Sequence, residues 1–377
     1  MHPAFTLDPT ITFLNHGSYG ACPLAVQQAQ SLLRAQLEAE PVRFMTRELE
    51  PLLDASRARL ADFLGARPAD LAFVPNATTG VNAVLRSLTL QPGDELVTTN
   101  HGYNACTNAL RFVAERAGAR VVIAQVPFPL EAAEQALEAV RRAVTPRTRL
   151  VLFDQITSPT ALVFPVDALV KELETSGVRV LVDAAHAPGM LPLHLDETGA
   201  SYTTGNLHKW VCAPKGAAFL HVRRDRQAEV RPAVISHGAN SRRTDKSRFQ
   251  LEFDWTGTGD PTAYLCVPQA LDVMASLHPD GWPGLMRANR DAATKAGELL
   301  SEALQPFRGA RSLPGASMVS VEVPGPPDGL QDRLFHHHRI EVPIIPFEGK
   351  TLVRVSMQAH TSLDDVERLA RVLPRLG

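Results

Sequence analysis

The chain has 377 residues, which exceeds what one hydrophobic core usually holds and predicts a large and a small domain. Hydrophobic residues make up 45% and charged residues 21%, which excludes a disordered chain and favours a folded globular protein. With 38 basic and 40 acidic residues the net charge is -2, which excludes a global attraction to polyanions. We therefore expect neither nucleic acid nor a membrane as partner.

The four cysteines exclude a disulfide or zinc framework, because they lie far apart and form no Cys-x-x-Cys pair. They are Cys22, Cys106, Cys212 and Cys266. The first residues lack the basic and apolar regions of a secretory signal, and no uncharged apolar run approaches 18 residues. These features predict a cytoplasmic protein without a transmembrane helix.

Apolar periodicity predicts alternating helices and strands through the first half of the chain. The expected helices are 26–40, 48–64, 81–90, 103–117, 130–143 and 166–176, and the expected strands are 71–74, 95–99, 120–125, 150–154 and 178–183. The strands are short, continuous apolar runs, which is typical of a mostly parallel sheet covered by helices on both faces. The fold class predicted is therefore α/β.

From about residue 268 the pattern changes to long helices with few strands. We expect helices over 267–277, 284–304, 329–338 and 363–376 and strands over 318–323 and 351–356. This arrangement predicts a smaller α+β domain over 267–377, after a large domain over 26–266 and an N-terminal segment over 1–25. A cleft between the two domains is the expected ligand site.

Lys209 and Asp183 each end a strand-like run and together indicate chemistry on pyridoxal 5'-phosphate (PLP). Lys209 lies in Gly205-Asn206-Leu207-His208-Lys209-Trp210, and Asp183 in Leu181-Val182-Asp183-Ala184-Ala185-His186. A lysine amine can bond the aldehyde of PLP, and a carboxylate can keep the pyridine nitrogen protonated so that the ring withdraws electrons. Lys215 is the competing lysine, although its surroundings are typical of a surface residue.

Three further motifs have a functional and a structural interpretation. Asn76-Ala77-Thr78-Thr79-Gly80 opens a helix, so it can bind a phosphate or simply form an N-cap. Tyr103 can stack on a flat ring or pack in the core. The turn from Trp255 to Pro261 can bring Thr258 to a phosphate, or it is only a turn.

Histidines and one arginine complete the candidate residues. His186 follows Asp183 by three residues and can hydrogen-bond a cofactor ring, or it is a structural histidine. Arg354 lies inside an apolar strand, where it either meets a substrate carboxylate or occupies a sheet edge. The run His336-His337-His338 is expected to be surface-exposed without a shared metal, because consecutive helical residues point in different directions.

In this order, the Asn-Ala-Thr-Thr, Asp-x-x-His and His-Lys motifs resemble the class V aminotransferase superfamily of PLP enzymes, fold type I. The resemblance extends from Phe13 to Ser356 and is strongest to the isopenicillin N epimerase-like branch. It implies a large domain with a seven-stranded, mostly parallel sheet between helices and a homodimer with shared active sites. Desulfurases of this superfamily carry a mobile late cysteine, whereas this chain has none after Cys266, which argues against persulfide transfer.

The resemblance also implies residue roles. Lys209 is the Schiff-base lysine, Asp183 pairs with the ring nitrogen and His186 stands beside the ring. Tyr103 takes the stacking position and Arg354 receives the substrate carboxylate. The remaining implied positions are Thr78, Thr79 and His208 at the phosphate, Thr258 at the phosphate of the neighbouring subunit, and Asn15, His16 and Ser158 on the substrate side.

The expected reaction is α-proton removal from an amino acid by Lys209, for which epimerisation is the favoured outcome. Loss of a β-substituent, as in a C–S lyase, and transamination start from the same step and remain alternatives. A basic run over 242–248 either binds an extra substrate carboxylate or is a solvated loop. A PLP-binding protein without turnover has no positive support, and a dinucleotide-binding protein lacks the G-x-G-x-x-G turn.

Overall fold

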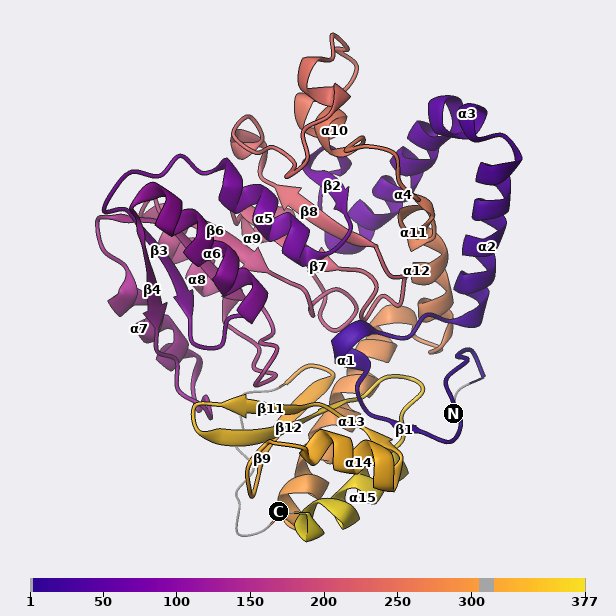
Figure 1. The fold of residues 1–377 in the computed structure, drawn as a ribbon, viewed down its shortest axis with the longest axis vertical. Coiled ribbons are helices and arrows are strands. Elements are labelled where there is room, and N and C mark those ends of the chain that lie inside the picture. Colours follow the sequence, from indigo (N-terminus) through magenta and orange to yellow (C-terminus); the bar gives the residue numbers. More distant parts are fainter. Residues whose placement is uncertain (1–2, 305–314, 377) are drawn as a thin grey trace.

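The computed structural model describes residues 3–304 and 315–376, and its centre is a seven-stranded sheet (Figure 1). The parallel core strands have continuous apolar runs, as their sequences predict. Strand β8 is antiparallel to both of its neighbours. In spatial order the strands are β2 (Leu71–Val74), β8 (Ala218–Val222), β7 (Tyr202–Asn206), β6 (Arg179–Asp183), β5 (Thr148–Asp154), β3 (Glu95–Thr99) and β4 (Arg120–Ala124).

Alternate residues of these strands point into two separate cores, which is why the runs are apolar throughout. Phe153 and Val182 belong to one core, whereas Leu152 and Leu181 belong to the other. The first core is covered by α2 (Leu24–Ala39), α4 (Leu49–Leu64), α7 (Ala133–Ala143), α8 (Val166–Thr175) and α12 (Val267–Ser276). The second is covered by α5 (Ala77–Ser87), α6 (Asn104–Ala117) and α10 (Arg248–Phe253). The expected α/β sandwich is thus confirmed.

A three-stranded antiparallel sheet in the C-terminal part of the chain has its own core, which includes Leu300, Val321 and Val353 (Figure 1). Its elements are α13 (Gly281–Ala303), β9 (Met318–Val323), α14 (Leu330–His338), β11 (Ile344–Phe347), β12 (Lys350–Ser356) and α15 (Leu363–Val372). The N-terminal β1 (Thr12–Phe13) pairs with β10 (Ile340–Glu341) of this region. The predicted domain boundaries stay a prediction, and residues 1–2, 305–314 and 377 of those ranges lie outside the described residues.

Some elements have weak sequence signals. Strand β7 contains two threonines and a glycine but is fully buried, and the Thr204 hydroxyl donates to the Phe219 carbonyl 2.7 Å away. The remaining short helices are α1 (His16–Tyr19), α3 (Pro41–Arg43), α9 (Leu195–Thr198) and α11 (Thr262–Leu265), with a π-helical turn at Phe44–Glu48. No helix within 3–304 or 315–376 is long and apolar enough to cross a membrane.

Gly20 ties the N-terminal segment to the chain around Lys209 and yields a stability prediction. Its φ is 71°, and a Cβ placed there would lie 2.1 Å from the carbonyl oxygen of His208. We expect Gly20→Ala to lower the free energy of unfolding by about 3 kcal/mol, since backbone strain and overpacking each cost roughly 1–3 kcal/mol.

Gly93→Ala is the matched control, because Gly93 has a φ of 87° but no atom within 4 Å of the added Cβ. Gly93→Ala introduces only the backbone strain of a positive φ, so we expect it to lower the free energy of unfolding by about 1–2 kcal/mol. Urea unfolding of both variants gives the comparison. An equal decrease in the free energy of unfolding of both variants would contradict a steric clash between the added Cβ at Gly20 and the His208 carbonyl.

Candidate active site

Polar side chains from several neighbouring strands meet where the parallel strands end. Asp154 ends β5, Asp183 ends β6, and Lys209 lies three residues after β7. Because the carboxyl ends of parallel strands form one edge, these groups surround a common cavity of about 270 Å³. Its lining consists of Ser18, Tyr19, Asn76, Ala77, Thr78, Tyr103, Asp154, Ile156, Ser158, Asp183, Ala185, His186, Asn206, His208 and Lys209.

The Lys209 amine has the properties of a nucleophile. Burial, reinforced by the nearby Arg354 guanidinium, lowers the pKa of Lys209 to about 7. The amine lies 3.1 Å from Nε2 of His186, and the indole N–H of Trp210 donates to Nδ1 of the same imidazole at 3.3 Å. A large fraction of the amine is therefore uncharged at neutral pH. Lys215 is exposed and donates to the Gly20 carbonyl at 3.0 Å.

The lowered pKa of Lys209 predicts how cofactor capture depends on pH. Only the neutral amine adds to an aldehyde, so we expect the rate of PLP uptake by cofactor-stripped protein to rise about tenfold per pH unit below pH 7. Above roughly pH 8 the rate should level off. The measurement is visible absorbance after mixing, over a pH series. A rise that continues to pH 10 would indicate an unperturbed lysine.

Asp183 is a buried carboxyl with two local donors. The Ala185 amide donates to Oδ1 at 2.9 Å and the Cys106 thiol donates to Oδ2 at 3.2 Å. Burial raises the pKa of Asp183 and, together with the charge of Asp183, raises the pKa of Asp154 well above its usual range. A cationic ring nitrogen beside Asp183 would favour the ionised carboxylate and so offset the effect of burial.

The start of α5 forms an anion cradle next to the lysine. Asn76 caps the helix by accepting from the Thr79 amide at 2.8 Å, and Asn206 accepts from the Ala77 amide at 2.9 Å. Thr78 and His208 line the cavity, whereas the Thr79 hydroxyl donates to Asn76 at 3.1 Å. Because the Ala77 and Thr79 amides are bound to asparagine side chains, a phosphate here would rely on Thr78 and on the positive end of the helix dipole. The Thr79 hydroxyl is directed at the cap in this structure, and its expected phosphate contact stays a prediction.

Arg354 on β12 is a buried guanidinium without an acidic partner among the described residues. It is 3% exposed and lies behind the cavity lining: its Nη1 donates to the Ser158 carbonyl at 2.5 Å and to the Ser158 hydroxyl at 3.1 Å, and its Nη2 donates to the Ser18 hydroxyl at 3.3 Å. Its Nε has no hydrogen-bond partner, and burial lowers the pKa of Arg354 to about 10. Because a buried charge needs a counter-charge, this geometry leaves a place for an anion beside Ser18 and Ser158.

Asn15 and His16 do not line the cavity, in contrast to the expectation for the substrate side. Asn15 donates to the Glu341 carboxylate at 2.8 Å. The His16 ring is fully buried, with Nδ1 2.9 Å from Nε2 of His360 and Nε2 3.0 Å from the Lys209 carbonyl. Both ring nitrogens are thereby engaged, and His16 holds the backbone of Lys209; the expected roles of Asn15 and His16 on the substrate side stay predictions.

Two tyrosines stand at the mouth of the cavity. Tyr103 precedes α6 and is 46% exposed, and Tyr19 at the end of α1 is 75% exposed. Thr258 is exposed and lies outside the cavity lining of its own chain. Its expected contact with a neighbouring subunit stays a prediction.

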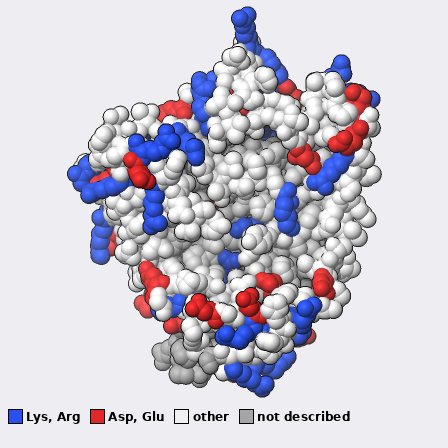
Figure 2. Space-filling model, viewed as in Figure 1, with Lys and Arg blue, Asp and Glu red and all other residues white. Residues whose placement is uncertain are grey.

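The basic run over 242–248 is engaged in ion pairs. Arg243 binds the Glu50 carboxylate at 2.6 Å, Lys246 binds Asp54 at 2.7 Å and Arg248 binds Glu252 at 3.1 Å. These contacts favour the structural interpretation of the loop. In Figure 2, acidic and basic side chains lie mainly around the edge of the face shown, whereas its centre is largely uncharged.

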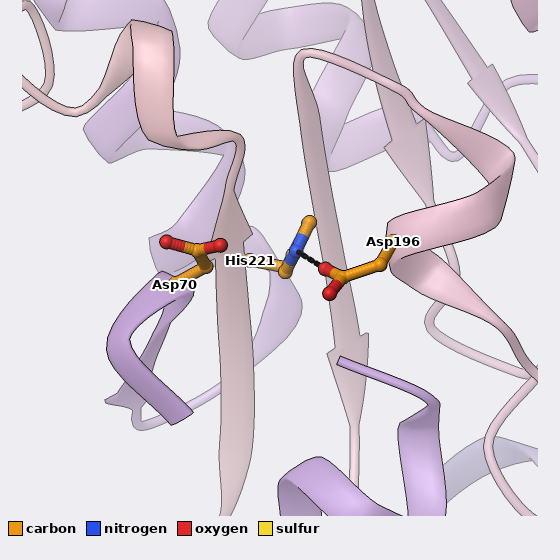
Figure 3. Close-up of side chains that lie close together, drawn as sticks. All are labelled: Asp70, Asp196 and His221. Carbon is orange, nitrogen blue, oxygen red and sulfur yellow. Dashed lines mark hydrogen bonds and ion pairs between the residues drawn. The ribbon is translucent and has the colours of Figure 1, made fainter. Parts of the chain in front are cut away.

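A second cluster of ligand-type side chains lies away from the cavity and is formed by Asp70, Asp196 and His221 (Figure 3). His221 Nε2 lies 3.3 Å from the Asp196 carboxylate. The Arg67 guanidinium lies 2.6 Å from Asp70 and 3.5 Å from Asp196. Arg67 already supplies the positive charge that a metal ion would bring, so this cluster is an ion-pair network. His336 and His337 are exposed at the end of α14.

The cavity fits PLP on three independent counts. It has an amine with a lowered pKa for the aldehyde, a buried carboxyl for the ring nitrogen and a helix N-terminus for the phosphate. At the carboxyl edge of a mostly parallel sheet, this combination defines a PLP-dependent enzyme of fold type I.

The chain belongs to the class-V aminotransferase family, whose members use PLP: the family model "Aminotransferase class-V" matches residues 22–278. It is 35% identical to the isopenicillin N epimerase of Amycolatopsis lactamdurans, over 99% of this chain and 96% of that protein. An L-cysteine desulfhydrase of Arabidopsis thaliana is 28% identical, over 96% and 87% respectively. The solved structure of a cystine C–S lyase with its product cysteine persulfide has a TM-score of 0.82 at 22% identity, covering 97% of each chain.

Two residues of the site have weak sequence signals. For Asp154 the signal is its position at the end of a buried strand, which it shares with Asp183, and the Cα positions of the two are paired in the sheet. Trp210 has the signal of an aromatic residue beside Lys209, whereas the hydrogen bond from its indole N–H to His186 depends on the fold.

Proposed function

We propose that this PLP enzyme epimerises an amino acid or amino-acid conjugate at its α-carbon. The observation that carries the proposal is the buried Arg354, which lacks an acidic partner among the described residues and lies behind two serines of the Lys209 cavity. A substrate α-carboxylate would satisfy Arg354 and thereby fix the α-carbon near the lysine amine. The epimerases among the relatives, at 35% and 33% identity, support this outcome.

The residues divide the work as follows. When bound, PLP would supply an aldehyde for the substrate amino group and an electron-withdrawing ring for the bond that breaks at the α-carbon. Asp183 would hold the proton on the ring nitrogen, while Thr78, the α5 N-terminus and His208 would hold the phosphate. Lys209 Nζ removes the α-proton, which its pKa of about 7 permits at neutral pH.

Inversion requires a second proton donor that reaches the α-carbon from another side. We assign this role to the phenol of Tyr103. Tyr103 lines the cavity from the segment before α6, whereas Lys209 lines it from the segment after β7, so the two side chains come from different elements. Burial raises the pKa of Tyr103, so the phenol keeps its proton and can donate it.

Reaction in deuterium oxide tests the proposal. The holoenzyme is incubated with single L-amino acids and their conjugates, and α-deuterium, the D-isomer and oxo acids are quantified. Epimerisation predicts α-deuterium in both isomers without oxo acid. Tyr103→Phe should lower inversion at least about 100-fold and leave deuterium exchange in the L-isomer. Tyr19→Phe is the matched control at the same mouth. Oxo acid without D-isomer would contradict the proposal.

A second candidate is β-elimination of a sulfur substituent, which the L-cysteine desulfhydrase relatives support. Cys266, the last cysteine of the chain, is 1% exposed, which argues against transfer of the sulfur to the thiol of Cys266 and favours its release in a free product. Release of pyruvate and sulfide from cysteine, each in equal amount, would establish this alternative.

We also propose a homodimer with shared sites. Tyr19, Leu24 and Tyr103 are exposed apolar or aromatic side chains, two of them at the cavity mouth, where a second copy could cover them. Thr258 of one subunit would then contact the phosphate in the other. Light scattering should give the dimer mass, and a fully active monomer would exclude shared sites.

A further inference from the structure

The indole of Trp210 and the imidazole of His186 form a buried hydrogen bond beneath the Lys209 amine. Trp210 has 0% exposure, so its N–H has no water to bind and needs an acceptor in the protein. That acceptor is Nδ1 of His186 at 3.3 Å. Nδ1 can accept only when it carries no proton.

The same contact determines where the imidazole proton lies. A neutral imidazole has one N–H, so an unprotonated Nδ1 places the proton on Nε2. Nε2 of His186 lies 3.1 Å from Lys209 Nζ. The N–H on Nε2 can donate a hydrogen bond to the amine only if the amine is uncharged and accepts through its lone pair. The arrangement therefore favours an uncharged lysine.

We propose that Trp210 is a positioning residue that holds His186 as the Nε2–H tautomer, so that the imidazole donates into the cavity toward Lys209. The opposite tautomer would place two N–H groups against each other at Trp210 and would accept from a charged ammonium at Lys209. By fixing the tautomer of His186, Trp210 thus makes the imidazole a hydrogen-bond donor that stabilises the uncharged form of Lys209. The inference concerns cofactor capture and does not depend on whether the enzyme is an epimerase or a lyase.

The environment is consistent with this assignment. Burial lowers the pKa of His186 well below its usual value, and Lys209 and Arg354 lower it further, so a doubly protonated ring is disfavoured. The other titratable or charged groups that face Lys209 or His186 are Arg354 on β12, Asp183 on β6, Asp154 on β5, Cys106 on α6, His208 beside the lysine and His16 on α1. Trp210→Phe removes none of these groups, and His16 is the one among them whose ring packs against Trp210, with ring centroids 4.9 Å apart.

Nuclear magnetic resonance of the holoenzyme with ¹⁵N-labelled histidine tests the tautomer directly. His186 signals are assigned by their loss in His186→Gln. The proposal predicts Nε2–H in the native protein and a mixture or Nδ1–H in Trp210→Phe. Nδ1–H in the native protein would overturn the proposal, and this result does not require the variant to fold.

Cofactor recapture after removal of PLP supplies a second readout. In Trp210→Phe the freed imidazole can stabilise the charged lysine, so the midpoint of the pH–rate profile should rise by about one pH unit. Recapture at pH 7 then falls several-fold and recovers at higher pH. Trp282→Phe, which removes an indole N–H bonded to the Leu271 carbonyl at 3.1 Å, is the matched control and should leave the profile unchanged. An equal loss at every pH in Trp210→Phe would show a packing role only and overturn the proposal.

Discussion

Lys209→Ala is expected to abolish the visible absorbance of the bound cofactor and to lower turnover by at least about 1,000-fold. The variant removes both the covalent anchor and the base, and general acid–base catalysis alone contributes roughly 100- to 10,000-fold. Asp183, Thr78 and Arg354 remain in place, so PLP should still bind, but without a covalent link. Absorbance spectra, equilibrium dialysis and turnover together give the result.

Lys215→Ala is the matched control for that variant. Lys215 is six residues further along, is exposed and bonds only the Gly20 carbonyl among the hydrogen bonds of the described residues. It should keep the visible band and the activity. A native-like band in Lys209→Ala, or its loss in Lys215→Ala, would contradict the assignment of the anchor.

Arg354→Met is expected to weaken substrate binding and yet stabilise the protein without substrate. Loss of charged hydrogen bonds to a carboxylate costs roughly 1.5–3 kcal/mol, so KM should rise about 10- to 150-fold. The free enzyme no longer buries an unpaired charge, so its free energy of unfolding should rise by about 1 kcal/mol or more. Steady-state kinetics and urea unfolding measure the two effects.

Arg57→Met is the control with the opposite expected sign. Arg57 is also buried, but it is paired with Asp54 and Asp254, so its loss removes charged hydrogen bonds and leaves Asp254 with Lys246, 3.5 Å away, as its remaining cationic partner. That variant should lose about 1.5–3 kcal/mol of stability. If Arg354→Met were destabilised in the same way, Arg354 would be a structural residue and not a carboxylate receptor.

The sequence was most informative where one physical effect dominated. Apolar runs identify β5 and β6 because both faces of the sheet are buried, and the end of β6 brings Asp183 to the same cavity as Lys209. Strand β7 has no apolar run to identify it, because its polar side chains are buried and depend on tertiary contacts such as the hydrogen bond that the Thr204 hydroxyl donates to the Phe219 backbone carbonyl.

Within the site, residues that act through long-range packing were the hardest to interpret. His16 was expected near the substrate, but the chain folds it under the Lys209 carbonyl, 193 positions away in sequence. The directions of the Trp210 indole and the Thr79 hydroxyl likewise depend on backbone geometry that no local motif determines. Residue type and spacing thus indicate the chemistry, whereas the fold determines which side chains contact the residues that carry it out.

Borohydride reduction of the holoenzyme, followed by peptide mass spectrometry, tests the central claim most directly. Reduction makes the lysine–cofactor link permanent, so the modified residue can be located. The account predicts one phosphopyridoxyl group per chain, on Lys209. Modification of Lys215 instead, or no modified lysine in a protein that binds PLP, would contradict it.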